Sequence, residues 1–442
     1  MYNHNKRIMR KKIITRSLFL LMTIMLVLTG CSNNGEEEIG KEPENPNTVV
    51  EEPDTKPNFN GQAIILNDMQ KSAVGNNNDF AFNFYRTVSQ SKDLKGKSNV
   101  ISPLSMTYLL GMLNAGAIGQ TSKELQTLLG FADSDASNIN ALCNKLIKEM
   151  PKVDEVVSLS IANLMAIDHS LTLEEQYKKD MNRFYEAEVA SLPFGSKESV
   201  DYINDWSNKH TEGLIPHLVD NLNGVMALMN AVYINAPWTE IFVPQNTKNE
   251  EFVKEDGERV TLPMMNGGFR GTSYTKTQNY EVLRKPYGLY HNWAMYILLP
   301  KEGRTIDDIL PELTNASWVE VLQGMENCPV KVKMPRFKTE NDIIMNKILE
   351  EMGTPSMFQP MQEFPLISSS NKDLFVNIVQ QKVTINVKEE GTEAAAVSLG
   401  IMTGSNGSEP QFINFHATRP FVYLIQEDSS GTIFFIGTYQ GD

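Results

Sequence analysis

The sequence predicts an α+β fold, with helices mainly in the first half of the chain and strands mainly in the second half. Phe80, Phe84 and Val88 recur at four-residue spacing, which is typical of the buried face of a helix. Residues 225–234 and 293–299 are nearly continuous apolar runs, as expected of strands that are covered on both faces. The change in periodicity between the two halves therefore indicates helices packed against buried sheets.

Further helices are predicted from capping signals. Ser102-Pro103 opens a helix, with serine as the N-cap and proline in the first turn. Thr121 and Glu124 have the spacing of a capping box, and Gly130 is expected to end the helix that follows. The other predicted helices are one that contains Ile203 and Trp206 and ends near Gly213, and one at residues 341–352.

Further strands are predicted in the second half of the chain. From Val330 to Met334 apolar residues alternate with lysines, which favours a strand with one face in water. The remaining predicted strands fall within residues 374–387, 420–425 and 432–437. No Pro/Gly/Ser-rich linker or internal repeat interrupts these elements, so we expect residues 61–442 to form a single domain with a large core.

The first thirty residues have the pattern of an export signal. Basic residues between Lys6 and Arg16 precede an apolar run from Leu18 to Leu28, which is too short to remain as a membrane-spanning helix. The run ends in Leu28-Thr29-Gly30-Cys31, which resembles the lipobox of bacterial lipoproteins.

The lipobox resemblance implies cleavage before Cys31 and lipid attachment to its thiol. The protein would then be anchored to the cell envelope, at the outer membrane or the cell surface. An ordinary signal peptide that happens to contain a cysteine is the alternative interpretation.

Residues 31–60 are rich in Pro, Glu and Asn and offer few apolar side chains to bury, so we expect a flexible acidic tether. Loss of the six basic residues of the signal changes the formal net charge from −14 to −20. Such an acidic protein is a poor partner for nucleic acid, because phosphate binding needs the opposite charge.

The chemistry-bearing residues do not form a familiar catalytic or metal-binding pattern. After Cys31, only Cys143 and Cys328 remain, and they either stay as buried free thiols, which we expect, or form a disulfide. The histidines show no metal-ligand spacing, and the sequence contains no nucleophile elbow, phosphate-binding loop or dinucleotide fingerprint. We therefore expect no cofactor, no metal and no enzymatic activity, with a hydrolase as the rejected alternative.

The segment that follows Gly391 is suited to become a strand. Successive residues of a strand point to opposite faces, so every second residue shares a face. One face would carry only small side chains, from Thr392, Ala394, Ala396, Ser398 and Gly400. This face could enter a packed sheet without overfilling it, although a merely flexible linker is the alternative interpretation.

Several motifs in this order resemble the serpin family, over roughly residues 77–441. The most specific is the hinge followed by the C-terminal signature Phe415-His-Ala-Thr-Arg-Pro420-Phe421. The hinge residues are Glu389, Glu390, Gly391, Thr392, Glu393, Ala394, Ala395 and Ala396. The supporting stretches begin at Asn99, Met226, Val330 and Leu374. The resemblance implies a monomer with large, mostly antiparallel sheets and an exposed reactive-centre loop at about residues 391–411.

The resemblance also implies how such a protein acts. A protease cleaves the loop, is held as a covalent acyl-enzyme, and is distorted while the loop inserts into the central sheet. Counting sixteen residues from the first hinge glutamate places the scissile carbonyl at Ser405. An error of two or three residues keeps the neighbouring candidates open, which are Met402, Thr403, Gly404 and Asn406.

The loop composition bears on the choice of target. No Lys or Arg occurs from Gly391 to Thr418, whereas trypsin-like proteases need a cation for their specificity pocket. We therefore expect a serine or cysteine protease of elastase-like or papain-like preference. A non-inhibitory serpin that acts as a surface binding or chaperone-like module is the alternative, although the small hinge residues disfavour it.

By the same resemblance, the region that lets the central sheet open comprises Ser102, Ser105, Asn230, Trp238 and Gln381. Gln381 stands where most serpins have histidine, and Thr418 replaces a common aspartate. Because glutamine both donates and accepts hydrogen bonds, we expect the region still to hold the sheet closed.

Overall fold

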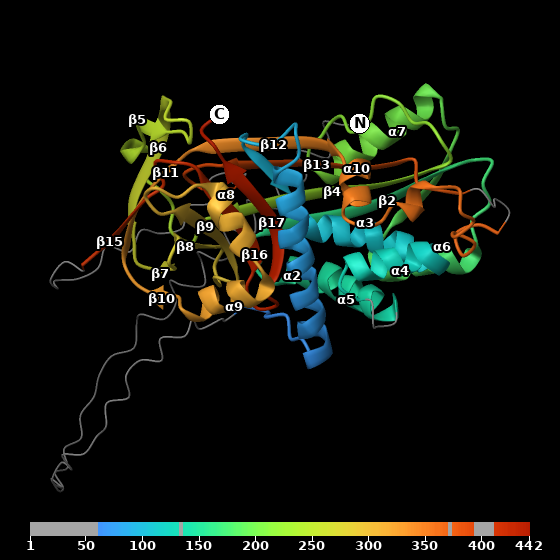
Figure 1. Ribbon diagram of the computed structural model, residues 1–442, viewed down its shortest axis with the longest axis horizontal. Helices are drawn as coiled ribbons and strands as arrows, with labels where there is room; N and C mark the ends of the chain where they lie inside the picture. The colour runs from blue at the N-terminus through green and yellow to red at the C-terminus, as the bar shows by residue number, and fades with distance from the viewer. Residues whose placement is uncertain (1–60, 132–135, 370–373, 393–410) are drawn as a thin grey trace, which may run out of the picture. The chain divides into compact units, whose positions relative to one another are not determined.

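The computed structural model describes residues 61–131, 136–369, 374–392 and 411–442. These residues belong to one compact unit, Thr55–Asp442, and confirm the α+β fold. The strands form three sheets of seven, six and four strands (Figure 1). Among the described residues, no helix is both long and apolar enough to cross a membrane.

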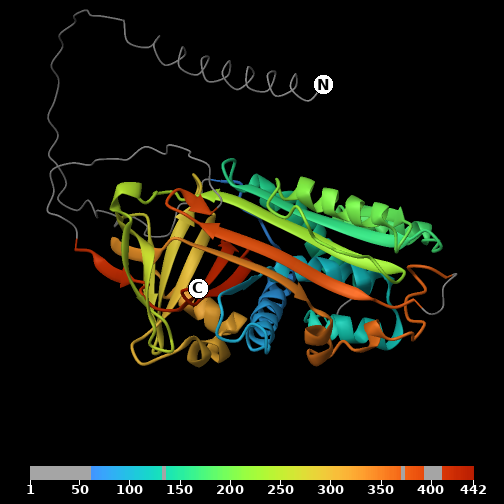
Figure 2. The ribbon, with the colours of Figure 1, turned by 90° about the horizontal axis from the view of Figure 1, so that it is seen from above.

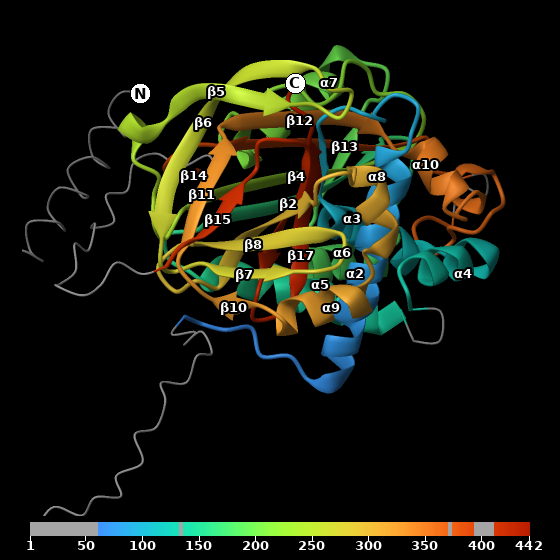
Figure 3. The ribbon, with the colours of Figure 1, turned by 60° about the vertical axis from the view of Figure 1, so that its left-hand side comes forward.

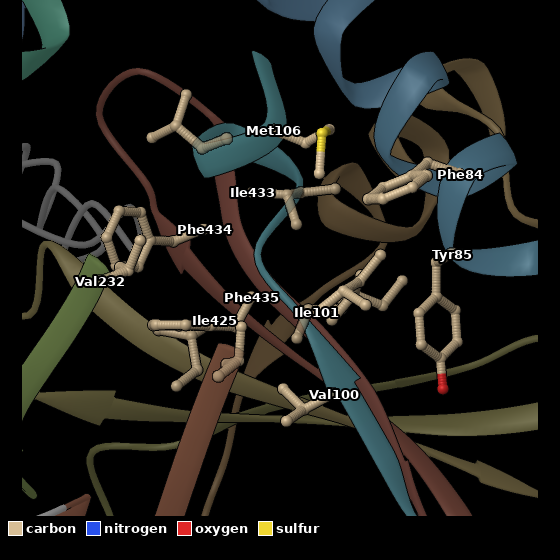
Figure 4. Packing of buried hydrophobic residues seen from close by; sticks show 14 of the residues in the cluster. Phe84, Tyr85, Val100, Ile101, Met106, Val232, Ile425, Ile433, Phe434 and Phe435 are labelled. Carbon is tan, nitrogen blue, oxygen red and sulfur yellow. The ribbon is translucent and has the colours of Figure 1, made fainter. Parts of the chain in front are cut away.

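The seven-stranded sheet is antiparallel throughout and forms much of the core. Its strands are, in spatial order, β1 (Asn99–Ile101), β17 (Thr432–Tyr439), β16 (Phe421–Glu427), β9 (Trp293–Pro300), β8 (Tyr280–Tyr287), β7 (Ser273–Lys276) and β10 (Glu326–Asn327). Figure 4 shows Ile433 packing beside Phe84 and Met106, which come from two helices. Both faces of β9, β16 and β17 are buried, which explains their continuous apolar runs.

Helices cover both faces of the six-stranded sheet. Its order is β12 (Phe337–Ile344), β13 (Ile378–Val387), β14 (Gly391–Thr392), β4 (Met226–Pro237), β2 (Ser158–Asp168) and β3 (Glu188–Leu192). On β4, Leu228 and Val232 belong to the main core, whereas Ala227 and Met229 pack toward Trp206 in α7 (Lys197–His210). Figures 1 and 2 show α7 on one face of this sheet and the other helices of the first half on the opposite face.

The four-stranded sheet contains β15, the first strand after the expected reactive-centre loop. Its order is β15 (Ile413–His416), β11 (Val330–Pro335), β6 (Arg259–Phe269) and β5 (Lys248–Val253), with β15 parallel to β11. Val330 and Val332 are buried while Lys331 is exposed, which confirms the predicted strand with one face toward solvent.

The remaining helices are α2 (Asp68–Ser89), α3 (Pro103–Gly116), α4 (Gly119–Leu128), α5 (Ala136–Glu149), α6 (Glu175–Tyr185), α8 (Ile306–Ile309), α9 (Asn315–Gln323) and α10 (Asn346–Glu351). Short 3₁₀ turns occupy Met150–Lys152, Pro244–Asn246, Leu310–Glu312 and Ser356–Phe358. Ser102 caps α3 as predicted, and its hydroxyl accepts a hydrogen bond from the Ser105 N–H.

Two local predictions were wrong. The helix α4 begins two residues before Thr121, so Thr121 and Glu124 do not form a capping box. The distant carboxylate of Glu363 accepts hydrogen bonds from the N–H groups of Gln120 and Thr121 instead. Residues 341–344 belong to β12, and only Asn346–Glu351 forms the helix expected at 341–352.

Candidate functional site

The structure describes the hinge from Glu389 to Thr392. The later hinge residues, Glu393, Ala394, Ala395 and Ala396, lie outside the described residues. The same holds for the scissile candidates Met402, Thr403, Gly404, Ser405 and Asn406, and for the lipidation candidate Cys31.

The start of the hinge lies between two strands of the six-stranded sheet. At one end, β13 and β4 pair directly in parallel, from Ile378 opposite Ala227 to Lys382 opposite Ala231. At the other end, β14 stands between them, and Thr392 pairs with Val387 on one side and Ala236 on the other. The two strands therefore part where the hinge enters (Figure 3).

Gly391 permits this entry because no side chain fits at its position. Its φ of +152° belongs to a region that favours glycine, and a Cβ atom would lie 2.2 Å from the Ala236 carbonyl oxygen. The Lys388 N–H donates to the Gly391 carbonyl at 2.8 Å and closes a tight turn before β14.

Thr392 is fully buried at the same point. Its hydroxyl lies 2.6 Å from the hydroxyl of Tyr287, which is at the end of β8. The Tyr287 ring stacks on Trp238 with centroids 4.2 Å apart. Thr392 thus contacts one member of a stacked aromatic pair rather than solvent.

Glu389 fixes the hinge through its carboxylate. Arg336 binds it with two nitrogens at 2.5 and 3.0 Å, and the Thr247 hydroxyl donates at 2.6 Å. Burial alone would raise the pKa of Glu389, but the hydrogen bonds from Arg336 and Thr247 bring it below its ordinary value. The carboxylate therefore stays ionised at neutral pH.

Backbone groups hold the rest of the hinge. The Trp238 N–H donates to the Glu390 carbonyl and the Phe242 N–H donates to the Glu389 carbonyl, each at 2.9 Å. The Trp238 indole N–H also donates to the Lys388 carbonyl at 2.9 Å. Trp238 therefore contacts the hinge, and the structure separates it from the other four residues of the expected sheet-opening region.

Those four residues form two buried networks where β13 and β4 meet. Gln381 accepts from the Ser102 N–H at 3.0 Å and donates to the Ser102 carbonyl at 2.8 Å. The Ser105 hydroxyl donates to Asn230, whose amide donates to Asn163 at 2.7 Å. Gln381 and Asn230 face each other in the sheet register, so each network holds one side of the junction.

Sequence reasoning missed four contact residues, namely Asn163, Thr247, Tyr287 and Arg336. Thr247, Tyr287 and Arg336 contact the hinge, whereas Asn163 contacts Asn230, and each of the four is distant in sequence from its partner. Only Arg336 lay in a segment that had been singled out, as the residue after the Val330–Pro335 strand.

The two later cysteines are both free, with Cys143 buried and Cys328 only partly buried. Burial raises the pKa of the Cys143 thiol well above its ordinary value, which makes it unreactive. Within the described ranges, no group of histidine, cysteine or carboxylate side chains could hold a metal ion.

Known proteins match this chain over most of its length. A family model described as serpin (serine protease inhibitor) matches residues 75–440. Antithrombin-III of Mus musculus is 31% identical over 374 residues, which cover 82% of this chain and 80% of that protein. An uncharacterised serpin-like protein of Thermococcus kodakarensis is 30% identical and covers 96% of this chain and 98% of its own length.

Solved structures agree with the sequence comparisons. The native state of tengpin, a thermophilic serpin, has a TM-score of 0.77 at 25% identity and covers 86% of this chain and 95% of its own. Human thyroxine-binding globulin has a TM-score of 0.75 at 26% identity, with coverage of 84% and 98%. Members of this family are generally protease inhibitors rather than catalytic enzymes. With the hinge entering its sheet between β13 and β4, the chain belongs to the serpin family.

Proposed function

We propose that this protein is an exported, lipid-anchored inhibitor that traps its target protease by inserting its cleaved loop between β13 and β4. The observation that carries the proposal is the position of Thr392, which already pairs with both strands. Beyond Lys382 and Ala231, the described parts of β13 and β4 no longer pair with each other. A strand continuing antiparallel from Thr392 would supply partners for both edges.

The side chains of the loop suit this path. Thr392 faces the core beside Tyr287, so residues two, four and six positions later would face the core as well. The next two on this face are Ala394 and Ala396, and small side chains can enter without overpacking.

The trapping step needs no catalytic group from this chain. The nucleophile of the protease attacks the scissile carbonyl, the peptide bond to the next residue breaks, and the new amine leaves with a proton. The N-terminal part of the loop then remains bound to the protease as an ester, or as a thioester where the nucleophile is a cysteine. Insertion of this part moves the protease before water can release it, and the intact protein persists because conversion is slow.

We place the scissile bond after Ser405, within the Met402 to Asn406 region, and expect targets with small or apolar specificity pockets. The absence of Lys and Arg from Gly391 to Thr418 supports this preference. A non-inhibitory binding protein is the second candidate, because thyroxine-binding globulin, named for binding a small molecule, shares the fold.

The proposal is tested by incubating the mature domain with elastase-like, chymotrypsin-like, papain-like and trypsin-like proteases. We expect a denaturant-resistant complex with at least one non-trypsin protease, and a released peptide that begins between Thr403 and Gly407. The cleaved protein should melt well above the intact one. Cleavage without a complex or a rise in melting temperature would favour the binding protein, and trapping of trypsin alone would refute the proposed preference.

The anchor is tested separately with Cys31→Ala. We expect the precursor to remain uncleaved and the protein to leave the membrane fraction. Normal processing and membrane association of this variant would refute lipidation at Cys31 without affecting the inhibitor proposal.

A further inference from the structure

Lys285 is a buried lysine that contacts residues 238–242, the segment that is hydrogen-bonded to the hinge. It lies on β8, on the same face as Tyr287, and only 1% of its surface is exposed. Its ammonium nitrogen lies 3.5 Å from the ring centroid of Phe269, 4.9 Å from that of Phe242 and 5.0 Å from that of Trp238. It donates to the Glu240 backbone carbonyl at 2.7 Å.

The charged groups around Lys285 do not neutralise it. Glu240 attracts it electrostatically, but the Glu240 carboxylate accepts from the N–H groups of Arg270 and Gly271. The neighbouring Arg284 binds Asp428 at 2.7 Å, and on β9 the residue opposite Lys285 is Met295. Within the described ranges, no carboxylate forms an ion pair with Lys285. Burial therefore lowers the pKa of Lys285 to about 7, opposed only by Glu240.

The segment that Lys285 contacts is the one that holds the hinge. Trp238 and Phe242 donate their N–H groups to the carbonyls of Glu390 and Glu389, and Glu240 lies between them in the chain. The lysine touches all three of these residues, two through their rings and one through its carbonyl. Its contacts thus fix the position of the two N–H groups.

We propose that Lys285 is a positioning residue for loop insertion, holding residues 238–242 against β8 so that the hinge enters between β13 and β4. A charged amine binds a carbonyl and aromatic faces more strongly than a neutral amine does. Insertion should therefore compete better with release of the protease when Lys285 is charged. This inference rests on the proposed inhibitory function.

The effect of Lys285 on the melting temperature distinguishes a positioning role in insertion from a role in stabilising the fold. A buried cation without an ionic partner destabilises the fold, and methionine of similar length fills the same space without that cost. Because the folded pKa lies below that of the unfolded chain, this cost is full below pH about 7 and is lost as the pH rises toward 10.5. Lys285→Met should therefore melt at the same or a higher temperature than the wild type, most clearly at lower pH.

The first test compares Lys285→Met with the wild type for the fraction of encounters that end in a trapped complex rather than cleaved inhibitor. At about pH 6 we expect the variant to trap about threefold less, with the difference shrinking at about pH 8.5, where the wild-type amine is neutral. The protease's own pH dependence affects both proteins equally. Lys179→Met, at an exposed lysine of α6, should behave as the wild type. A trapped fraction equal to that of the wild type at every pH would overturn the proposal. A fall in trapping accompanied by a fall in melting temperature would overturn it as well.

The second test uses the unreacted protein and does not depend on inhibition. Hydrogen exchange read by mass spectrometry should be faster at residues 238–242 in Lys285→Met than in the wild type, and unchanged in β9. Faster exchange in a protein that traps no protease would support the positioning role while the inhibitor proposal fails. Equal exchange in variant and wild type would overturn the role of Lys285.

Discussion

The seven-stranded and six-stranded sheets differ in how far their hydrogen bonding is complete. In the first, β16 pairs with β17 on one side and β9 on the other along nearly its whole length. In the second, β13 and β4 pair directly only from Ile378 to Lys382 and then part around two hinge residues. The first sheet is paired throughout its centre, whereas in the second the described hinge residues separate two strands that pair directly elsewhere.

The two sheets are connected at the point where the second one opens. Ser102 is bound by Gln381 from the six-stranded sheet, while its hydroxyl donates to the Phe434 carbonyl in the seven-stranded sheet at 2.9 Å. Opening the junction of β13 and β4 therefore pulls on a residue that is fixed to the rigid core. The junction should therefore resist further opening of the sheet.

The largest effect is expected for Thr392→Arg, which should abolish trapping. Thr392 is fully buried against Tyr287, and an arginine there would bury a cation without a partner, at a cost of several kcal/mol. We expect the loop to be cleaved without forming a covalent complex on denaturing gels. Thr392→Ser, which keeps the hydroxyl, is the matched control. Undiminished trapping by the arginine variant would show that this face does not insert.

The complete sheet is probed by Leu298→Ala on its central strand β9. Leu298 is fully buried and pairs with Val422 and Val282 on the two neighbouring strands, so its truncation should cost about 2–5 kcal/mol. The melting temperature should fall by a similar amount in the intact and the cleaved protein, because the hydrogen bonding of this sheet should be complete in both. The exposed Val319→Ala in α9 should change stability by no more than about 0.5 kcal/mol. A loss confined to the intact form would contradict the division between the sheets.

The sequence predicted the long buried strands of both sheets better than the short or partly polar ones. The nearly continuous apolar runs at 225–234 and 293–299 correspond to β4 and β9 almost to the residue at their first ends, because burial on both faces dominates their composition. The sequence did not indicate β2 and β3 in the helical half, β7 and β8 in the seven-stranded sheet, or the strand at 341–344. In β12 buried and exposed residues alternate, and polar Thr339 and Asn341 take buried positions that a hydrophobic pattern does not reveal.

The site shows the same limit. Gly391 at the start of the hinge and the N-cap Ser102 could be recognised from the sequence, because their conformational roles leave a compositional pattern. The partners of the hinge could not, because Tyr287 and Arg336 meet it only through the fold. Trp238 was grouped with the sheet-opening residues, yet it lies at the hinge end of β4.

A smaller effect is expected for Gln381→Ala at the junction. The variant leaves the buried Ser102 N–H and carbonyl without their side-chain partner, at a cost of about 1–3 kcal/mol. We expect the intact protein to melt lower and to insert its loop more readily, while the cleaved form changes less because its strands are already apart. The control is Gln380→Ala, at the neighbouring residue of β13, which removes an exposed hydrogen bond to Asp342 of β12. An equal loss in both forms would mean that Gln381 does not restrain opening.

The smallest effect is expected for Glu389→Gln, which tests how firmly the hinge is held before cleavage. Gln keeps the size of the side chain but loses the charge that binds Arg336, whose side chain is 45% exposed, so solvent should limit the loss to about 1 kcal/mol. Since the pKa of Glu389 is lowered in the folded protein, its stabilising charge is fully present above the ordinary value of 4.5 and is lost as the pH falls through the lower folded value. The difference in melting temperature between wild type and variant should therefore be present at neutral pH and vanish in acid. Glu390→Gln, at a residue that acts on Arg336 only through longer-range attraction, should show a weaker difference at neutral pH. A pH-independent difference for Glu389→Gln would mean that the shape of the side chain, and not its charge, holds the hinge in the open part of the sheet.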